Sequence, residues 1–167
     1  TALVSAPTQI VGSIANADLY DVAQLAHTLS ECQPEAMVVV GGYDSAPPAV
    51  QRPMLSLCRN LGQALDRLPR SLRPFIVYAG NQSIAETAAS YLRLANNATP
   101  LAVVDNVMPS PSQINPVPIA NTLTDYHWRA CHRITGFREV AGWVTSPGQI
   151  NSLETSFIQF VTMWAGF

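Results

Sequence analysis

The sequence predicts an α/β fold, with a mostly parallel sheet of about four or five strands and helices on both of its faces. The first observation is a set of short apolar runs at 36–40, 75–79 and 101–105, none of which alternates with polar residues. Such continuous runs are typical of strands buried on both faces. The second is that the segments between the runs repeat apolar residues at steps of three and four, as one helix face does. The third is composition, because 167 residues that are 48% hydrophobic and 12% charged can bury a core.

One helix and one weak strand are expected before the first run. Asp18 is a suitable N-cap, because its side chain can accept a hydrogen bond from the free amides of a first helical turn. The apolar face of that helix would hold Leu19, Val22, Leu25, Ala26 and Leu29. Residues 9–14 (QIVGSI) are a candidate strand, which Gly12 weakens because glycine is unfavourable inside strands.

Two further helices are expected between the three runs. The apolar face of the first holds Met54, Leu57, Cys58, Leu61, Leu65 and Leu68. The apolar face of the second holds Ile84, Ala88, Tyr91, Leu92 and Ala95. Strand, helix, strand, helix and strand in this order is the pattern of βαβ units, whose crossovers are right-handed.

A long loop and two helices are expected after the third run. Four prolines in residues 106–118 hold that loop extended and resist helix formation. A helix over 116–134 follows, and its apolar face would hold Ile119, Leu123, Tyr126, His127, Ala130, Cys131 and Ile134. A last helix is expected over 147–165, and residues 137–144 fit either a loop or a short edge strand.

We expect these elements to form a single α/β domain over 1–167 that is a fragment of a longer protein. The chain begins at Thr1 without a methionine and ends at Phe167 directly after an apolar helical pattern. The low charged fraction favours a surface that a partner or the rest of a longer chain covers, and a second copy of the chain could cover it in a dimer.

Charge and cysteine content exclude several classes of function. A net charge of −2 provides no basic field for nucleic acid or for an anionic membrane, and no apolar run approaches the length of a membrane span. All nine basic residues are arginines, so the chain lacks the lysine of a phosphate-binding loop or of a Schiff base. Three widely spaced cysteines form no disulfide framework, which favours free thiols in the reducing cytoplasm.

Glycine and polar residues follow all three predicted strands. In an open parallel sheet, ligands collect at the carboxyl ends of the strands. The candidate ligand-binding residues are therefore Gly41, Gly42, Asp44, Gly80, Asn81 and Asn106. Glycine amides can face an anion, and a carboxylate can hold a sugar hydroxyl, a water or Mg²⁺. The alternative is that the glycines only form turns, with Asn81 or Ser83 as a helix cap.

No catalytic or metal-binding residue is predicted. The chain contains neither a G-x-G-x-x-G fingerprint nor a nucleophile elbow. His127, Cys131 and His132 have the spacing of metal ligands, but the first two fall in an apolar stripe and fit a core histidine and a core thiol better. Arg67, Arg70 and Arg73 fit a solvated connection better than an anion-binding patch.

Three blocks of the sequence resemble the MutL-like family associated with glutamate mutase, which is unrelated to the mismatch-repair protein of the same name. They are VVVGGYDS at 38–45, FIVYAGN at 75–81 and DNVMP at 105–109. Family members read L-x-G-G-x-D-G-G, then v-Y-A-G-N, then N-V-M-P, in the same order. The blocks fall in the stretches 36–46, 75–83 and 101–118.

This resemblance implies one lobe of an ASKHA-like protein, the superfamily of actin, sugar kinases and heat-shock ATPases. It also implies a parent that uses ATP to reactivate or protect adenosylcobalamin-dependent glutamate mutase. Two departures matter: Asp44 is followed by Ser45 and Ala46 instead of two glycines, and the D-x-G-S/T phosphate motifs of such ATPases are absent. ATP and Mg²⁺ would therefore bind only in the full-length parent.

We expect a non-catalytic module of a MutL-like protein that contributes a ligand cleft and an interaction surface. Its expected partners are a cobalamin-dependent mutase subunit and a second copy of itself. The alternatives are a small-molecule or nucleotide-binding enzyme domain that uses Asp44 and Asn81, and a purely structural dimerisation domain whose glycines only form turns.

Overall fold

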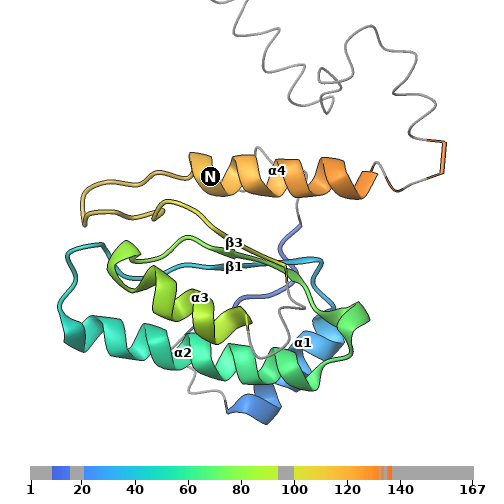
Figure 1. Ribbon diagram of the computed structural model, residues 1–167, viewed down its shortest axis with the longest axis horizontal. Helices are drawn as coiled ribbons and strands as arrows, with labels where there is room; N and C mark the ends of the chain where they lie inside the picture. The colour runs from blue at the N-terminus through green and yellow to red at the C-terminus, as the bar shows by residue number, and fades with distance from the viewer. Residues whose placement is uncertain (1–8, 16–20, 94–99, 132, 134, 137–167) are drawn as a thin grey trace, which may run out of the picture. The chain divides into compact units, whose positions relative to one another are not determined.

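The computed structural model of the chain describes residues 9–15, 21–93, 100–131, 133 and 135–136 (Figure 1). The chain divides into two compact units. The sheet unit is Gln9–Ile119, and the C-terminal unit combines Thr1–Thr8 with Ala120–Phe167.

The sheet unit contains three parallel strands in the order β1-β2-β3. They are β1 (Ala36–Val39), β2 (Phe75–Tyr78) and β3 (Leu101–Val103). In the register of the sheet, Val38 pairs with Val77, which pairs with Ala102. All three apolar runs are therefore strands and the α/β class is correct, but the described residues hold three strands where four or five were predicted. Residues 9–14 form no strand, and all of them except Ile14 are exposed.

Helices cover one face of this sheet. Helix α2 (Pro48–Arg67) connects β1 to β2, and the short η3 (Gln82–Ile84) with α3 (Ala85–Arg93) connects β2 to β3. Because the strand order follows the chain order, right-handed crossovers place both helices on the same side. Figure 1 shows α2 and α3 side by side below the sheet. Helices on both faces were predicted, and for the face opposite α2 and α3 this stays a prediction, because most of α4 belongs to the C-terminal unit.

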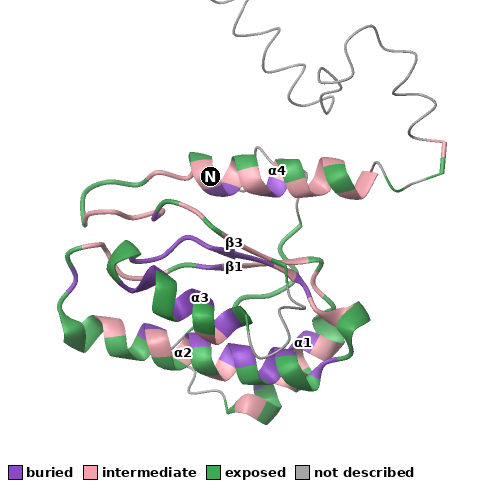
Figure 2. Cartoon of the chain, viewed as in Figure 1, coloured by how far each residue is buried: buried purple, intermediate pink, exposed green. Residues whose placement is uncertain are grey.

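The core of the sheet unit lies between its helices and the sheet. Helix α1 (Val22–Cys32) packs against α2 and joins the same hydrophobic cluster. The best-buried members of the cluster are Leu25, Cys58, Ala64, Leu65, Ile76, Tyr78, Ala88 and Leu92. Figure 2 shows buried residues along the facing sides of α2 and α3. Burying one large apolar side chain stabilises the folded state by about 1.5–3 kcal/mol. The apolar residues that predicted the helices are therefore also the residues that stabilise the unit.

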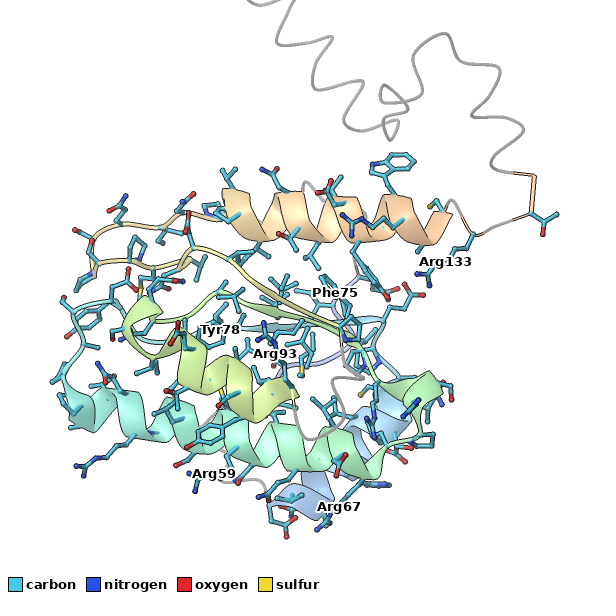
Figure 3. The ribbon with its side chains drawn as sticks, viewed as in Figure 1. Arg59, Arg67, Phe75, Tyr78, Arg93 and Arg133 are labelled. Atoms are coloured by element: carbon cyan, nitrogen blue, oxygen red, sulfur yellow. The ribbon has the colours of Figure 1, made fainter. Side chains whose placement is uncertain are left out.

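Two polar contacts at the helix surfaces help to fix this packing. The Arg59 guanidinium of α2 donates a 2.8 Å hydrogen bond to the Tyr91 hydroxyl of α3, and it lies 4.8 Å from the Tyr91 ring centre (Figure 3). At the end of α2, Arg73 donates to the carbonyls of Leu68 and Asp66 and pairs with the Asp66 carboxylate at 3.6 Å. Arg73 therefore helps to hold the C-terminal end of α2 in place.

Helix α1 begins later than predicted. Its N-cap is Asp21, whose side chain accepts from the Gln24 amide at 2.8 Å, while the Gln24 side chain accepts from the Asp21 amide at 3.1 Å. This reciprocal pair is a capping box. Asp18 and Leu19, which were predicted to belong to the helix, lie outside the described residues.

Helix α4 (Val117–Cys131) confirms the helix predicted over 116–134, with an earlier end. The predicted helix over 147–165 and the ambiguous stretch 137–144 lie outside the described residues. Among the described helices, none combines the length and the apolar character that crossing a membrane would require.

Candidate functional site

The six predicted ligand-binding residues meet at the carboxyl edge of the sheet, and we call them the strand-end rim: Gly41, Gly42, Asp44, Gly80, Asn81 and Asn106. Main-chain hydrogen bonds continue the strand pairing into the rim. The Asn81 amide donates to the Gly41 carbonyl at 3.1 Å, and the Val107 amide donates to the Ala79 carbonyl at 3.0 Å. Asp44, Asn81 and Asn106 therefore lie at one edge of the sheet, where the carboxyl ends of parallel strands meet.

Asn81 joins the end of β2 to the loop after β1. It is 1% exposed, and its Nδ2 donates to the Tyr43 carbonyl at 2.7 Å. Its Oδ1 accepts from the main-chain amide of Ser83 at 2.8 Å and from the Ser83 hydroxyl. The side chain therefore caps η3, as the turn interpretation anticipated, and also fixes the neighbouring loop.

Asn106 performs the same task from the end of β3. It is 2% exposed, and its Nδ2 donates to the Gly42 carbonyl at 3.0 Å and to Asp44 Oδ1 at 2.8 Å. Its Oδ1 accepts from the Met108 amide at 3.0 Å. The loop after β3 is thus fastened to the loop after β1, across the intervening strand.

Asp44 places a carboxylate oxygen at the start of η3. Its Oδ1 accepts from the Gln82 amide at 2.9 Å as well as from Asn106, and its own amide donates to the Pro109 carbonyl at 3.1 Å. The sequence predicts that free amides there would attract an anionic ligand. In the structure the Gln82 amide faces Asp44 and the Ser83 amide faces Asn81, so the chain's own side chains already occupy these donors.

The three glycines of the rim are required by its backbone geometry. Gly41 and Gly42 have φ values of 153° and 69°, which other residues rarely adopt. At Gly80, a β-carbon would lie 2.9 Å from the Gly41 carbonyl oxygen and 3.1 Å from the Tyr78 hydroxyl. The ends of β1 and β2 can approach this closely only because Gly80 has no side chain.

Comparison with protein families identifies the chain. The family model described as MutL protein matches residues 1–149. The chain belongs to the MutL protein family. The matched stretch includes all six residues of the strand-end rim. Comparisons with curated proteins and with solved structures found no match.

The MutL-family rim also depends on residues that sequence reasoning missed. Tyr78 is fully buried at the end of β2, and its hydroxyl donates to the Asn81 carbonyl at 3.0 Å (Figure 3). Burial raises the pKa of Tyr78 and keeps its hydroxyl a neutral donor. Gln82 Nε2 donates to the Val104 carbonyl at 2.8 Å and to the Gly80 carbonyl at 3.3 Å. Only their positions could have pointed to them, because Tyr78 lies shortly before the Gly80–Asn81 turn and Gln82 directly after it.

The polar groups of the MutL-family rim are bonded to one another and to nearby main chain. Its side-chain amides donate and accept hydrogen bonds, its one carboxylate accepts them, and these bonds hold the main chain in place. Among the described residues, no group of three or more His, Cys, Asp or Glu side chains could hold a metal ion. His127 and Cys131 lie in contact with each other on α4, away in sequence from the rim.

Proposed function

We propose that this MutL-family chain is a non-catalytic module that supplies an interaction surface and one wall of a ligand cleft to a larger parent protein. The observation that carries the proposal is the bonding of Asp44. The rim's one carboxylate accepts hydrogen bonds from Gln82 and Asn106, which holds it in a structural position. A general base needs instead to reach a substrate proton.

The proposal includes what the resemblance implies about the parent. That parent would be ASKHA-like and cytoplasmic, and it would use ATP and Mg²⁺ to reactivate or protect adenosylcobalamin-dependent glutamate mutase. The family match supports the MutL part of this statement. The mutase partner rests on the three sequence blocks, and nucleotide chemistry would come from phosphate motifs elsewhere in the parent.

The rim suits a cleft wall because it is rigid. Two buried amide side chains and several main-chain bonds connect all three strand ends, so little conformational entropy remains to be lost on binding. The loop that follows the rim supplies an apolar element, because Ile114 is 75% exposed and its neighbour Asn115 donates to the Val107 carbonyl at 2.7 Å. A partner could therefore contact a loop that is already ordered.

The first test uses the chain alone with ATP and Mg²⁺. We expect no phosphate release above background from the wild type, from Asp44→Ala or from the control Asp105→Ala, which alters an exposed neighbouring carboxylate. Hydrolysis that disappears in Asp44→Ala and persists in Asp105→Ala would replace this proposal with the enzyme alternative.

The second test uses the full-length parent with inactivated glutamate mutase, ATP and Mg²⁺. We expect recovery of mutase activity with the wild-type parent and a reduced recovery with Asn106→Ala, because that change releases the loop after β3 from the rim. No recovery with the folded wild-type parent would contradict the mutase part of the proposal and leave the module itself in place.

A structural dimerisation domain is the second candidate function. Exposed valines lie at both edges of the described sheet: Val103 on β3 is 40% exposed, and Val40, directly after β1, is 47% exposed. Edge strands of this kind can pair with another chain. Sedimentation equilibrium at micromolar concentrations tests the candidate, and a monomer throughout the range would eliminate it.

A further inference from the structure

One nucleophile and one base lie in contact on α4, outside the strand-end rim. Cys131 Sγ and His127 Nε2 are 3.3 Å apart, within the reach of a hydrogen bond that involves sulfur. The two residues are four positions apart, so the helix itself places them on one face. From this geometry we propose that Cys131 is the reactive thiol of the chain, that His127 is its proton acceptor, and that the pair is a site of covalent modification by soft carbon electrophiles.

The surroundings of the pair favour this role. Cys131 and His127 are both half-buried, so a small reagent can reach the sulfur while part of the bulk water is excluded. The His127 ring meets the neighbouring Trp128 ring edge-on, with ring centres 5.6 Å apart and planes at 69°. This contact limits the rotation of the imidazole and helps to keep Nε2 directed at the sulfur. A nucleophile next to an oriented base is the usual arrangement for thiol activation.

The other two cysteines differ from Cys131 in informative ways. Cys58 is fully buried in the core, and burial raises the pKa of its thiol to about 12, so it should remain unreactive. Cys32 is exposed, but the described part of the chain provides no basic side chain in hydrogen-bond contact with its sulfur. Exposure alone therefore predicts that Cys32 reacts first, whereas activation by His127 predicts that Cys131 does.

The chemical step can be written for iodoacetamide as the probe. The Cys131 sulfur forms a bond to the methylene carbon of the reagent, the carbon–iodine bond breaks, and iodide leaves. The thiol proton passes to Nε2 of His127, in the tautomer that carries its own proton on Nδ1. The imidazolium then returns this proton to solvent, so no oxidant or reductant is needed.

The experiment measures alkylation rates of all three cysteines in the full chain, by mass spectrometry of peptides after timed exposure to iodoacetamide at pH 7. In the wild type we expect Cys131 to react faster than Cys32, and Cys58 to react last. His127→Gln keeps a polar side chain but cannot take up the proton, so we expect the Cys131 rate to fall on the order of tenfold while the Cys32 rate is unchanged. His27→Gln is the matched control, because His27 is an exposed histidine of α1 that lies 3.7 Å from Glu31, and the change should leave the Cys131 rate unchanged.

Two results would overturn the proposal. The first is a wild-type chain in which Cys32 reacts faster than Cys131, and this measurement needs no variant. The second is a His127→Gln variant with the helix content of the wild type by circular dichroism and an unchanged Cys131 rate.

Discussion

Asn81 and Asn106 hold the strand ends together from inside the protein, where a carboxylate would be costly to bury. A neutral amide both donates and accepts, so each side chain satisfies main-chain groups on two sides without a charge to desolvate. Asp44, the one carboxylate of the rim, is by contrast only half-buried. The choice of residue type at each position therefore follows the burial of that position.

Gly80 is the residue at which a single added carbon should be most damaging. In Gly80→Ala the new β-carbon would lie 2.9 Å from the Gly41 carbonyl oxygen, so the strand ends must separate. We expect a loss of about 1–3 kcal/mol in the free energy of unfolding, measured by urea denaturation. The control is Gly12→Ala, whose β-carbon would meet its nearest neighbour, Cys32 Sγ, at an ordinary 3.8 Å. Equal losses in the two variants would contradict the close approach at Gly80.

Cys58 and Tyr78 should make the protein less stable at alkaline pH. Burial raises the pKa of Cys58 from its ordinary 9.0 to about 12, and it raises that of Tyr78 as well. Above about pH 9 the unfolded chain therefore loses protons that the folded chain keeps. The free energy of unfolding is highest below pH 9 and should fall toward pH 12, by up to about 1.4 kcal/mol per pH unit for each group.

Urea denaturation of Cys58→Ala at several pH values between 7 and 11 isolates the contribution of the thiol. The cavity lowers stability at every pH, but the alkaline slope should become shallower than that of the wild type. Cys32→Ala, which removes an exposed thiol, should keep the wild-type slope. Parallel slopes for the wild type and Cys58→Ala would mean that Cys58 is not protected in the folded state.

At the scale of the element, short strands depend on the helices that connect them. β1 and β2 have four residues each and β3 has three, so the sheet by itself offers few hydrogen bonds. Helix α2 has 20 residues and presents Met54, Cys58, Leu61 and Leu65 to the core. The stability of the sheet unit therefore comes mainly from helix packing, with the strand ends secured by the rim.

The capping box of α1 provides a prediction at this scale. Asp21→Ala removes the oxygen that accepts from the Gln24 amide, and we expect the free energy of unfolding to fall by about 1 kcal/mol. Asp21→Asn keeps an acceptor oxygen and should lose much less. Urea denaturation of both variants gives the comparison. A loss in Asp21→Asn as large as in Asp21→Ala would show that the charge of Asp21 matters more than its hydrogen bond.

At the scale of the whole molecule, the sheet unit has a complete core of its own. Within the part of the chain that the structure describes, the members of its hydrophobic cluster and the apolar side chains packed against them come from residues 14–101. The bonds of the strand-end rim end at Asn115, also within Gln9–Ile119. A domain that has its own core, and whose strand ends are bonded by its own residues, should fold alone.

We therefore predict that a fragment of residues 9–119 unfolds in one cooperative thermal transition, followed by circular dichroism. A shorter fragment of residues 9–105 keeps all three strands but lacks Asn106 and the loop bonded to Ala79. It should melt at a lower temperature. If fragment 9–119 shows no cooperative transition, the sheet unit depends on the C-terminal unit for part of its stability.

The sequence alone determined which segments form the sheet unit. Continuous apolar runs and steps of three and four identified β1, β2, β3, α2 and α3, because buried strands and one-sided helices need those patterns. The N-cap of α1 was placed at Asp18, although the sequence holds the signal for Asp21, because Gln24 follows Asp21 at the spacing of a capping box. The strand count was overestimated because residues 9–14 have the composition of a strand but no partner strand beside them among the described residues.

For the site, the sequence alone determined where the rim lies, because parallel strands must bring their carboxyl ends to one edge. Only the tertiary structure decided what those residues do to one another. Asp44 and Asn106 are 62 positions apart, and no local pattern shows that one donates to the other. Strand order likewise decided that α2 and α3 cover the same face of the sheet. The sequence predicts the helices and the strands, but it does not show on which side of β2 the strand β3 is added.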